Sequence, residues 1–137
     1  MITPAQRRRL VQAARAVRAR AHAPYSKFRV GAAVLDERGW IHAGCNVENA
    51  SYGLTVCAER NAVAAAVAAG AKRIRAVAVV ADPAATPCGA CRQVLAEFGG
   101  PTADVLLAGP GGAVSSGTTV GTLLPHAFSF RRATSRR

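Results

Sequence analysis

The feature that most constrains the fold is an apolar run at residues 74–81, flanked on both sides by segments of helical composition. The run predicts a strand that is buried on both faces. The flanking segments, residues 57–69 and 88–98, predict helices that end at Gly70 and at Gly99-Gly100-Pro101. A strand between two helices is typical of an α/β sheet with helices packed on it.

Patterns on either side of this unit complete the prediction. A first helix begins with Thr3 as N-cap and Pro4 at its first position, and ends before Pro24. The other expected elements are strands at 28–34, 40–47 and 104–108, a turn at 36–39, a loop with one weak strand at 109–121, and a final turn at 123–128. We therefore expect an α/β fold: a mixed five-stranded sheet covered by helices on both faces, in three layers.

Composition limits the classes of protein that this chain can be. Its 137 residues, half of them hydrophobic, suit one globular domain spanning residues 1–137, and we expect 131–137 to be a disordered basic tail. No apolar run reaches membrane-spanning length, and no apolar stretch follows the N-terminal arginines as in a secretory signal. We expect a cytoplasmic protein with no membrane partner, in which four cysteines indicate metal binding or catalysis before disulfides.

The formal net charge of +11 is concentrated at the two ends of the chain. Ten of the 18 basic residues lie within residues 7–20 and 131–137, and the first acidic residue is Asp36. Basic ends can bind nucleic acid through its phosphates. The favoured interpretation is an arginine-rich helix face in solvent and a loose tail, so we expect no nucleic-acid partner.

Three cysteines predict a metal site. Cys57, Cys88 and Cys91 each stand at or near the start of a predicted helix, where the helix dipole favours the thiolate form. Cys88 and Cys91 are three residues apart and can reach one ion. Thiolates are ligands of Zn²⁺, and three protein ligands leave the fourth tetrahedral position open, as in catalytic sites. A fourth ligand from Cys45 would instead close the site, but this residue lies in a predicted strand.

Polar residues near these cysteines suit catalysis and binding. Glu59 follows Cys57 by two positions, where a carboxylate can face a zinc-activated water and move its proton. Asn46 and Glu48 are also two positions apart, at a strand end, so their side chains share a face. An amide and a carboxylate on one face suit hydroxyl groups, although an Asx-type turn would also explain Asn46.

Cys57-Ala58-Glu59 together with Pro87-Cys88-Gly89-Ala90-Cys91 resembles the signature of the zinc-dependent cytidine deaminases. Residues 23–33, 44–55, 91–98 and 123–128 resemble further segments of that family, so the likeness spans roughly residues 3–128. The resemblance implies one Zn²⁺ per chain and hydrolytic deamination of cytidine and deoxycytidine, with ammonia released, as in pyrimidine salvage.

The resemblance also implies roles for individual residues. Cys57, Cys88 and Cys91 bind zinc, Glu59 moves protons, and Arg60 donates to a cysteine sulfur with Gln93 holding Arg60. The backbone N–H of Ala58 holds the ring O2 and the Thr86 carbonyl accepts from the amine.

For the rest of the substrate, the resemblance implies that Asn46 and Glu48 bind the sugar and that Phe28 packs on the base. Phe128, with Phe130 as a rival, and Tyr52 reach a neighbouring active site in a homotetramer.

Other interpretations remain open from the residues. A nucleoside-antibiotic deaminase would use similar zinc residues, and a polynucleotide deaminase would fit the basic ends, although aromatic residues make up only 5% of the chain. Cys88 and Cys91 would also suit a redox pair, which leaves Cys57 and Glu59 unexplained. A closed four-cysteine structural zinc module would require Cys45.

Overall fold

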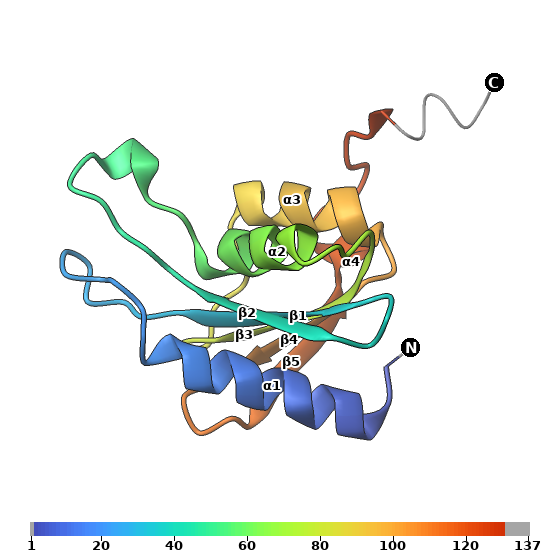
Figure 1. Ribbon diagram of the computed structural model, residues 1–137, viewed down its shortest axis with the longest axis horizontal. Coiled ribbons are helices and arrows are strands. Elements are labelled where there is room, and N and C mark those ends of the chain that lie inside the picture. The colour runs from blue at the N-terminus through green and yellow to red at the C-terminus, as the bar shows by residue number, and fades with distance from the viewer. Residues whose placement is uncertain (1, 131–137) are drawn as a thin grey trace.

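The computed structural model describes residues 2–130, which form three layers: a sheet with helices on both faces (Figure 1). The expected disordered tail, 131–137, lies outside the described residues. The helices are α1 (Pro4–Arg18), α2 (Ala58–Ala68), α3 (Gly89–Gly99) and α4 (Val120–Leu123), with a 3₁₀ turn at Tyr52–Leu54. The strands are β1 (Gly31–Asp36), β2 (Ile41–Cys45), β3 (Ile74–Val80), β4 (Asp104–Ala108) and β5 (Val114–Thr119).

The sheet is mixed, and its strand order is β2-β1-β3-β4-β5. Strands β3 and β4 are parallel and are joined through α3, whereas the other neighbouring pairs are antiparallel. The predicted five-stranded α/β sheet with helices on both faces is confirmed.

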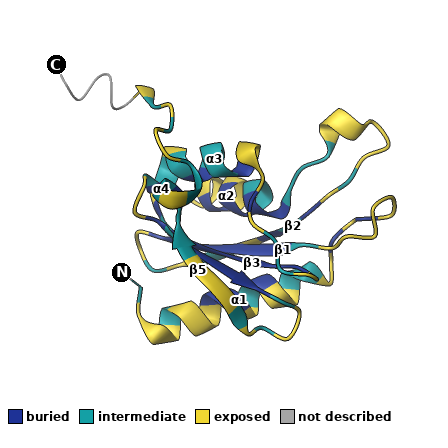
Figure 2. Cartoon of the chain, turned by 180° about the vertical axis from the view of Figure 1, so that it is seen from behind, coloured by how far each residue is buried: buried dark blue, intermediate teal, exposed yellow. Residues whose placement is uncertain are grey.

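Two hydrophobic cores lie on opposite faces of the sheet. Strand β1 is buried along its whole length (Figure 2). Its side chains alternate between the two cores. Val34 packs in the core under α2 and α3, whereas Leu35 packs in the core with Leu10 and Ala14 of α1. Apolar packing on both faces thus fixes the positions of α1 and α2 relative to the sheet.

Two glycines allow helices to approach the sheet closely. A Cβ at Gly44 of β2 would lie 2.4 Å from the backbone nitrogen of Ala62 in α2. A Cβ at Gly31 of β1 would lie 2.0 Å from the carbonyl oxygen of Ala14 in α1. Both helix backbones therefore rest directly on strand positions that have no side chain.

Element boundaries differ from the predictions in two informative places. The predicted strand at 28–34 begins only at Gly31, because the Asn46 side chain bonds the backbone of Phe28 and Val30 in place of a strand partner. Helix α3 includes Gly99, which was expected to stop it. A Cβ at Gly99 would lie 2.7 Å from the Ala103 Cβ, so close packing explains this glycine, and the chain leaves the helix at Gly100 with a φ of 62°.

The weak strand expected within 109–121 is β5, and the predicted Thr3 N-cap of α1 accepts a hydrogen bond from the Gln6 backbone. Within residues 2–130, no helix has both the length and the apolar character that crossing a bilayer requires.

Candidate active site

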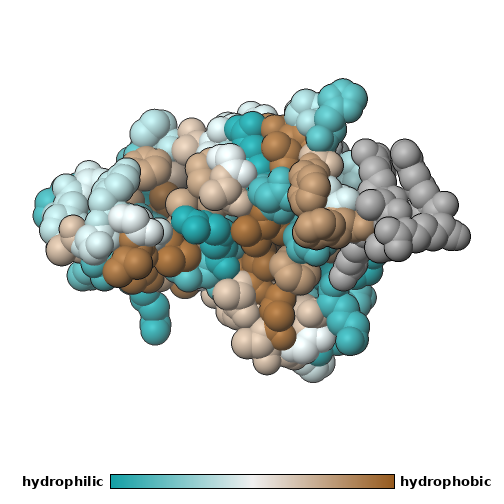
Figure 3. Space-filling view, turned by 90° about the horizontal axis from the view of Figure 1, so that it is seen from above, coloured by the Kyte–Doolittle hydropathy of each residue, from teal (hydrophilic) through white to brown (hydrophobic). Residues whose placement is uncertain are grey.

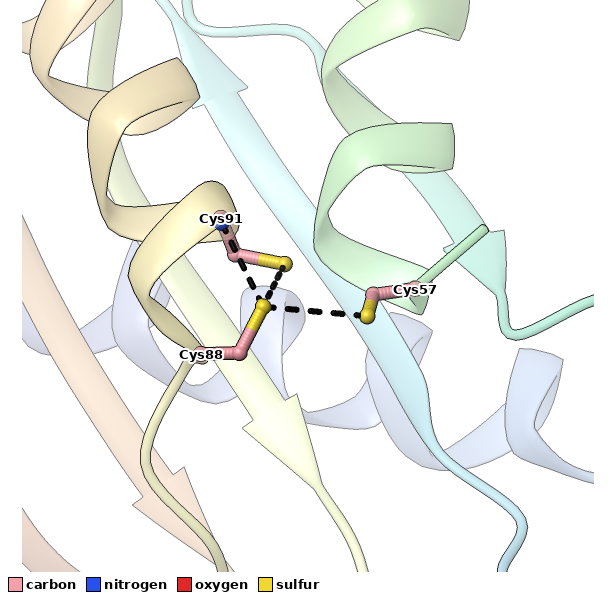
Figure 4. Close-up of side chains that lie close together, drawn as sticks. All are labelled: Cys57, Cys88 and Cys91. Carbon is pink, nitrogen blue, oxygen red and sulfur yellow. Dashed lines mark hydrogen bonds between the residues drawn. The ribbon is translucent and has the colours of Figure 1, made fainter. Parts of the chain in front are cut away.

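Three thiols from two helix starts meet at one end of the sheet (Figure 4). Cys57 is the N-cap of α2, Cys88 is the N-cap of α3, and Cys91 lies in the first turn of α3. The Sγ atoms of Cys57 and Cys88 are 3.9 Å apart, those of Cys88 and Cys91 are 3.3 Å apart, and all three lie within 4.8 Å of one another.

This arrangement fits a zinc ion. Thiolates at about 2.3 Å from a tetrahedral Zn²⁺ stand roughly 3.8 Å from each other, close to the spacing observed here. Cys45 is not a member of this cluster, and its carbonyl accepts a hydrogen bond from Asn61 instead. Three protein ligands are typical of a catalytic rather than a closed structural zinc site.

The charges around the thiols favour an anionic cluster. A hydrogen bond from Cys91, together with donation from Arg60, lowers the pKa of Cys57 to about 5. The same bond to Cys57, with burial, raises the pKa of Cys91, so the cluster holds a shared negative charge that a cation would neutralise. The Arg60 Nη2 lies 3.7 Å from the Cys57 Sγ, as the sequence interpretation expected for this arginine.

Glu59 lies beside the thiols and is almost entirely buried, with 5% of its surface exposed. Burial, and then the negative charge of Cys57, raises the pKa of this carboxyl. A carboxylate with a raised pKa accepts a proton more readily, which suits a group that takes up a proton and passes it on.

A cavity of about 190 Å³ opens onto these residues. Of the predicted site residues, Phe28, Asn46, Ala58, Glu59, Cys57 and Cys88 line it. It is also lined by Val30, Thr55, Val79, Ala85 and Thr86. Except for Thr86, this second group was not singled out from the sequence. Thr55 stands two residues before Cys57, and this proximity in the sequence could have identified it as a cavity residue.

Segment 25–30, which supplies Phe28 and Val30 to the cavity lining, is held by Asn46 and Glu48. Asn46 accepts from the Val30 backbone at 2.9 Å and donates to the Phe28 carbonyl at 2.8 Å. Glu48 accepts from the backbone of Tyr25 and Ser26 and from the Ser26 hydroxyl. These hydrogen bonds, led by that of the Ser26 hydroxyl, lower the pKa of Glu48.

Glu48 and Tyr52 lie at a neighbouring cavity of about 360 Å³, which Thr55 joins to the first because it lines both. The Tyr52 side chain is 90% exposed.

Phe128 lies elsewhere, against a cavity of about 310 Å³ beside α3 and α4, and its ring meets that of Phe130 edge to face at 4.9 Å. The side chain of Gln93 donates to the Phe128 carbonyl at 3.1 Å, and the expected contact of Gln93 with Arg60 stays a prediction. Neither Tyr52 nor Phe128 therefore lies in the cavity of about 190 Å³ beside the thiols, which we call the metal-side cavity.

Comparisons with known proteins agree with this geometry. Residues 4–107 match the family model described as the cytidine and deoxycytidylate deaminase zinc-binding region. The chain belongs to this family.

A cytidine deaminase from Sporosarcina psychrophila is 49% identical, over 88% of this chain and 90% of its own length. The crystal structure of a cytidine deaminase from Burkholderia pseudomallei has a TM-score of 0.83 at 49% identity, covering 93% of this chain and all of the other. A cytidine deaminase from Mycobacterium tuberculosis gives a TM-score of 0.80 at 42% identity, over 89% and 96% of the two chains.

Proposed function

We propose that this chain hydrolyses cytidine and deoxycytidine to uridine and deoxyuridine. Water adds its oxygen at C4 of the ring, the bond from C4 to the exocyclic nitrogen breaks, and ammonia leaves with the protons. The observation that carries the proposal is the buried Glu59 carboxyl beside three clustered thiols, with both opening onto one small cavity.

The thiols of Cys57, Cys88 and Cys91 would hold one zinc ion as thiolates. A bound zinc ion lowers the pKa of water to about 7 and so supplies a hydroxide nucleophile at neutral pH. Glu59 takes a proton from the attacking water and delivers it to N3 of the ring, and then moves a proton to the exocyclic nitrogen. Arg60, 3.7 Å from the Cys57 Sγ, offsets part of the negative charge of three thiolates.

Backbone groups at the cavity suit the polar edge of the base. Ala58 is the first residue of α2, so its N–H has no acceptor within the helix and can donate to the ring O2. Thr86 and Phe28 also line this cavity. In this proposal the Thr86 carbonyl accepts from the exocyclic amine and the Phe28 ring packs on the base. Asn46 and Glu48 add the contacts to the sugar hydroxyls.

The decisive experiment measures zinc content and uridine formation in the wild-type protein and in Glu59→Gln. We expect about one zinc per chain in both proteins, with turnover of the variant reduced by at least about a hundredfold, because general acid–base catalysis contributes that much or more. Glu97→Gln makes the same chemical change at an exposed carboxyl of α3 and should leave turnover unchanged. A wild-type protein that binds zinc but converts neither nucleoside would disprove the proposed substrate.

We further propose that the chain is one domain that acts as a homotetramer in the cytoplasm, in pyrimidine salvage. Large apolar side chains on the outside support assembly: Tyr52 is 90% exposed, Phe130 76%, and Leu54 and Phe128 65% each. Apolar patches also show on the face above α2 and α3 (Figure 3). Light scattering after gel filtration should give four times the chain mass, whereas a monomer mass would refute the tetramer and the sharing of active sites.

A further inference from the structure

Exposed arginines line a groove between α1 and the β4–β5 connection. Figure 1 shows α1 and this connection below the sheet. The groove has a volume of about 330 Å³. Arg7, Arg8 and Arg15 line it from α1, and the facing wall is formed by Gly111, Gly112 and Val114. The groove lies on the α1 face of the sheet, opposite the helices that carry the thiols.

The charge at this groove is not compensated within the described residues. No acidic residue precedes Asp36 in the chain, and both ion pairs found in residues 2–130 involve Asp36, with Arg38 and His42. Arg7 and Arg8 lie in the N-terminal half of α1, where the helix dipole is positive and already disfavours cations. An anion in the groove would relieve the repulsion of these charges with each other and with the dipole.

Glycines face two of the arginines across the space beside α1. A Cβ at Gly117 would lie 3.8 Å from the Arg7 Nη2, and one at Gly112 would lie 3.6 Å from the Arg15 Cδ. Arg7 and Arg15 thus reach over two glycines, at opposite ends of the segment that faces α1. Gly112 has a φ of 85°, which favours glycine, and the facing wall consists of two glycines and Val114.

We propose that this groove binds a compact anion that carries two or more phosphoryl groups. Guanidinium groups pair with phosphate oxygens through two parallel hydrogen bonds, and three of them exceed what a single phosphate needs. The volume is in the range of small-ligand sites. A nucleic-acid strand is less suited, because Arg9 lies on another side of α1, with Ala13 and Ile41, so the charges form no continuous track.

The test is titration calorimetry of inorganic tripolyphosphate into the zinc-loaded protein at about 0.1 M salt, where charges beyond about 10 Å are largely screened. The groove variant is the triple substitution Arg7→Gln, Arg8→Gln and Arg15→Gln. The control triple, Arg9→Gln, Arg20→Gln and Arg73→Gln, removes the same charge from exposed arginines outside the groove. Heat from chelation of the zinc is common to all three proteins and cancels in the comparison.

We expect one site per chain, with affinity at least about tenfold weaker in the groove variant and changed less than about threefold in the control. Cytidine turnover without the anion should be the same in all three proteins, which shows that they are folded and separates this proposal from the deaminase reaction. Equal weakening in both triples, no saturable binding by the wild-type protein, or tighter binding of a single-stranded oligonucleotide than of tripolyphosphate would overturn the proposal.

Discussion

The two walls of the metal-side cavity are built in different ways. One wall consists of the starts of α2 and α3, which pack on the sheet and carry the thiols and Glu59. The other wall includes Phe28 and Val30 of the irregular segment 25–30, which belongs to no helix or strand and is held by the side chains of Asn46 and Glu48. The thiols and Glu59 thus stand on rigid elements, whereas Phe28, the proposed contact to the base, stands on a segment fastened by a few hydrogen bonds.

This difference separates chemistry from recognition. Displacing a helix start would require repacking of a buried core, which is costly. Segment 25–30 can shift when single polar contacts are lost, because its residues 25–29 are exposed. Substitutions in the first wall should therefore abolish the reaction, and those in the second should change affinity and stability first.

The largest effect is expected at the buried Cys91. Cys91→Ser replaces a thiolate by a hydroxyl, which is a poor zinc ligand, so zinc should be lost and turnover should fall at least about a thousandfold. Zinc analysis and a uridine assay measure both effects. Cys45→Ser lies outside the cluster and should keep its zinc. Loss of zinc from Cys45→Ser would show that Cys45 is a fourth ligand. The site would then be a closed structural site rather than an open catalytic one.

Asn46→Ala tests the second wall. It leaves the Val30 N–H and the Phe28 carbonyl without their partner, which should lower the free energy of unfolding by about 2–4 kcal/mol. The KM for cytidine should also rise, because segment 25–30 loses its anchor. Urea unfolding and steady-state kinetics measure the two effects. Asn49→Ala removes an exposed amide three residues after Asn46 and should cost less than about 1 kcal/mol.

Asp36 provides a test of stability away from both walls. Its burial would raise its pKa, but hydrogen bonds from His42, Arg38 and Trp40 lower the pKa well below the ordinary range. A lowered folded-state pKa means that the carboxylate stabilises the fold above about pH 4 and that this stability is lost as the pH falls further.

Asp36→Asn should therefore lower the free energy of unfolding by about 1–3 kcal/mol at pH 7. In urea unfolding at a series of pH values, the variant should lose less stability at acid pH than the wild-type protein does. Its KM should remain unchanged. A changed KM would mean that the cavity walls are coupled to the far end of β1.

The smallest effect is expected for Ser26→Ala. The Ser26 hydroxyl donates to Glu48 and accepts from the Phe28 N–H at 3.0 Å, so it links the proposed sugar contact to the proposed base contact. Its removal should raise KM by several-fold, with kcat nearly constant and stability changed by less than about 1 kcal/mol. Ser116→Ala, on the exposed part of β5, is the matched control. An equal fall in kcat would contradict the separation of the two walls.

The sequence predicted the first wall better than the second. Cys57, Cys88 and Glu59 were found because helix starts and ligand spacing are local properties of the chain. The sheet was also predictable, since β1 and β3 are largely apolar and β3 lies between two segments of helical composition.

The hydrogen bonds of the second wall join residues that are far apart in the chain. Asn46 reaches back 16 residues to Val30, and Glu48 reaches 22 residues to Ser26. No periodicity encodes such pairs, so the linking role of Ser26 and the late start of β1 were not predictable. The same holds for Gln93, whose partner, the Phe128 carbonyl, lies 35 residues away.

Gly44 has a consequence for how this chain can vary. The backbone of α2 passes so close to β2 that even one added carbon at position 44 would collide with it. The N-cap of α2 is Cys57, which faces α3. Position 44 should therefore be among the least variable in any population of working sequences, although it touches no substrate. Gly53, with open space around it, should accept many residues. Mutational tolerance in this chain thus follows the clearance between backbones as well as the distance from the reaction.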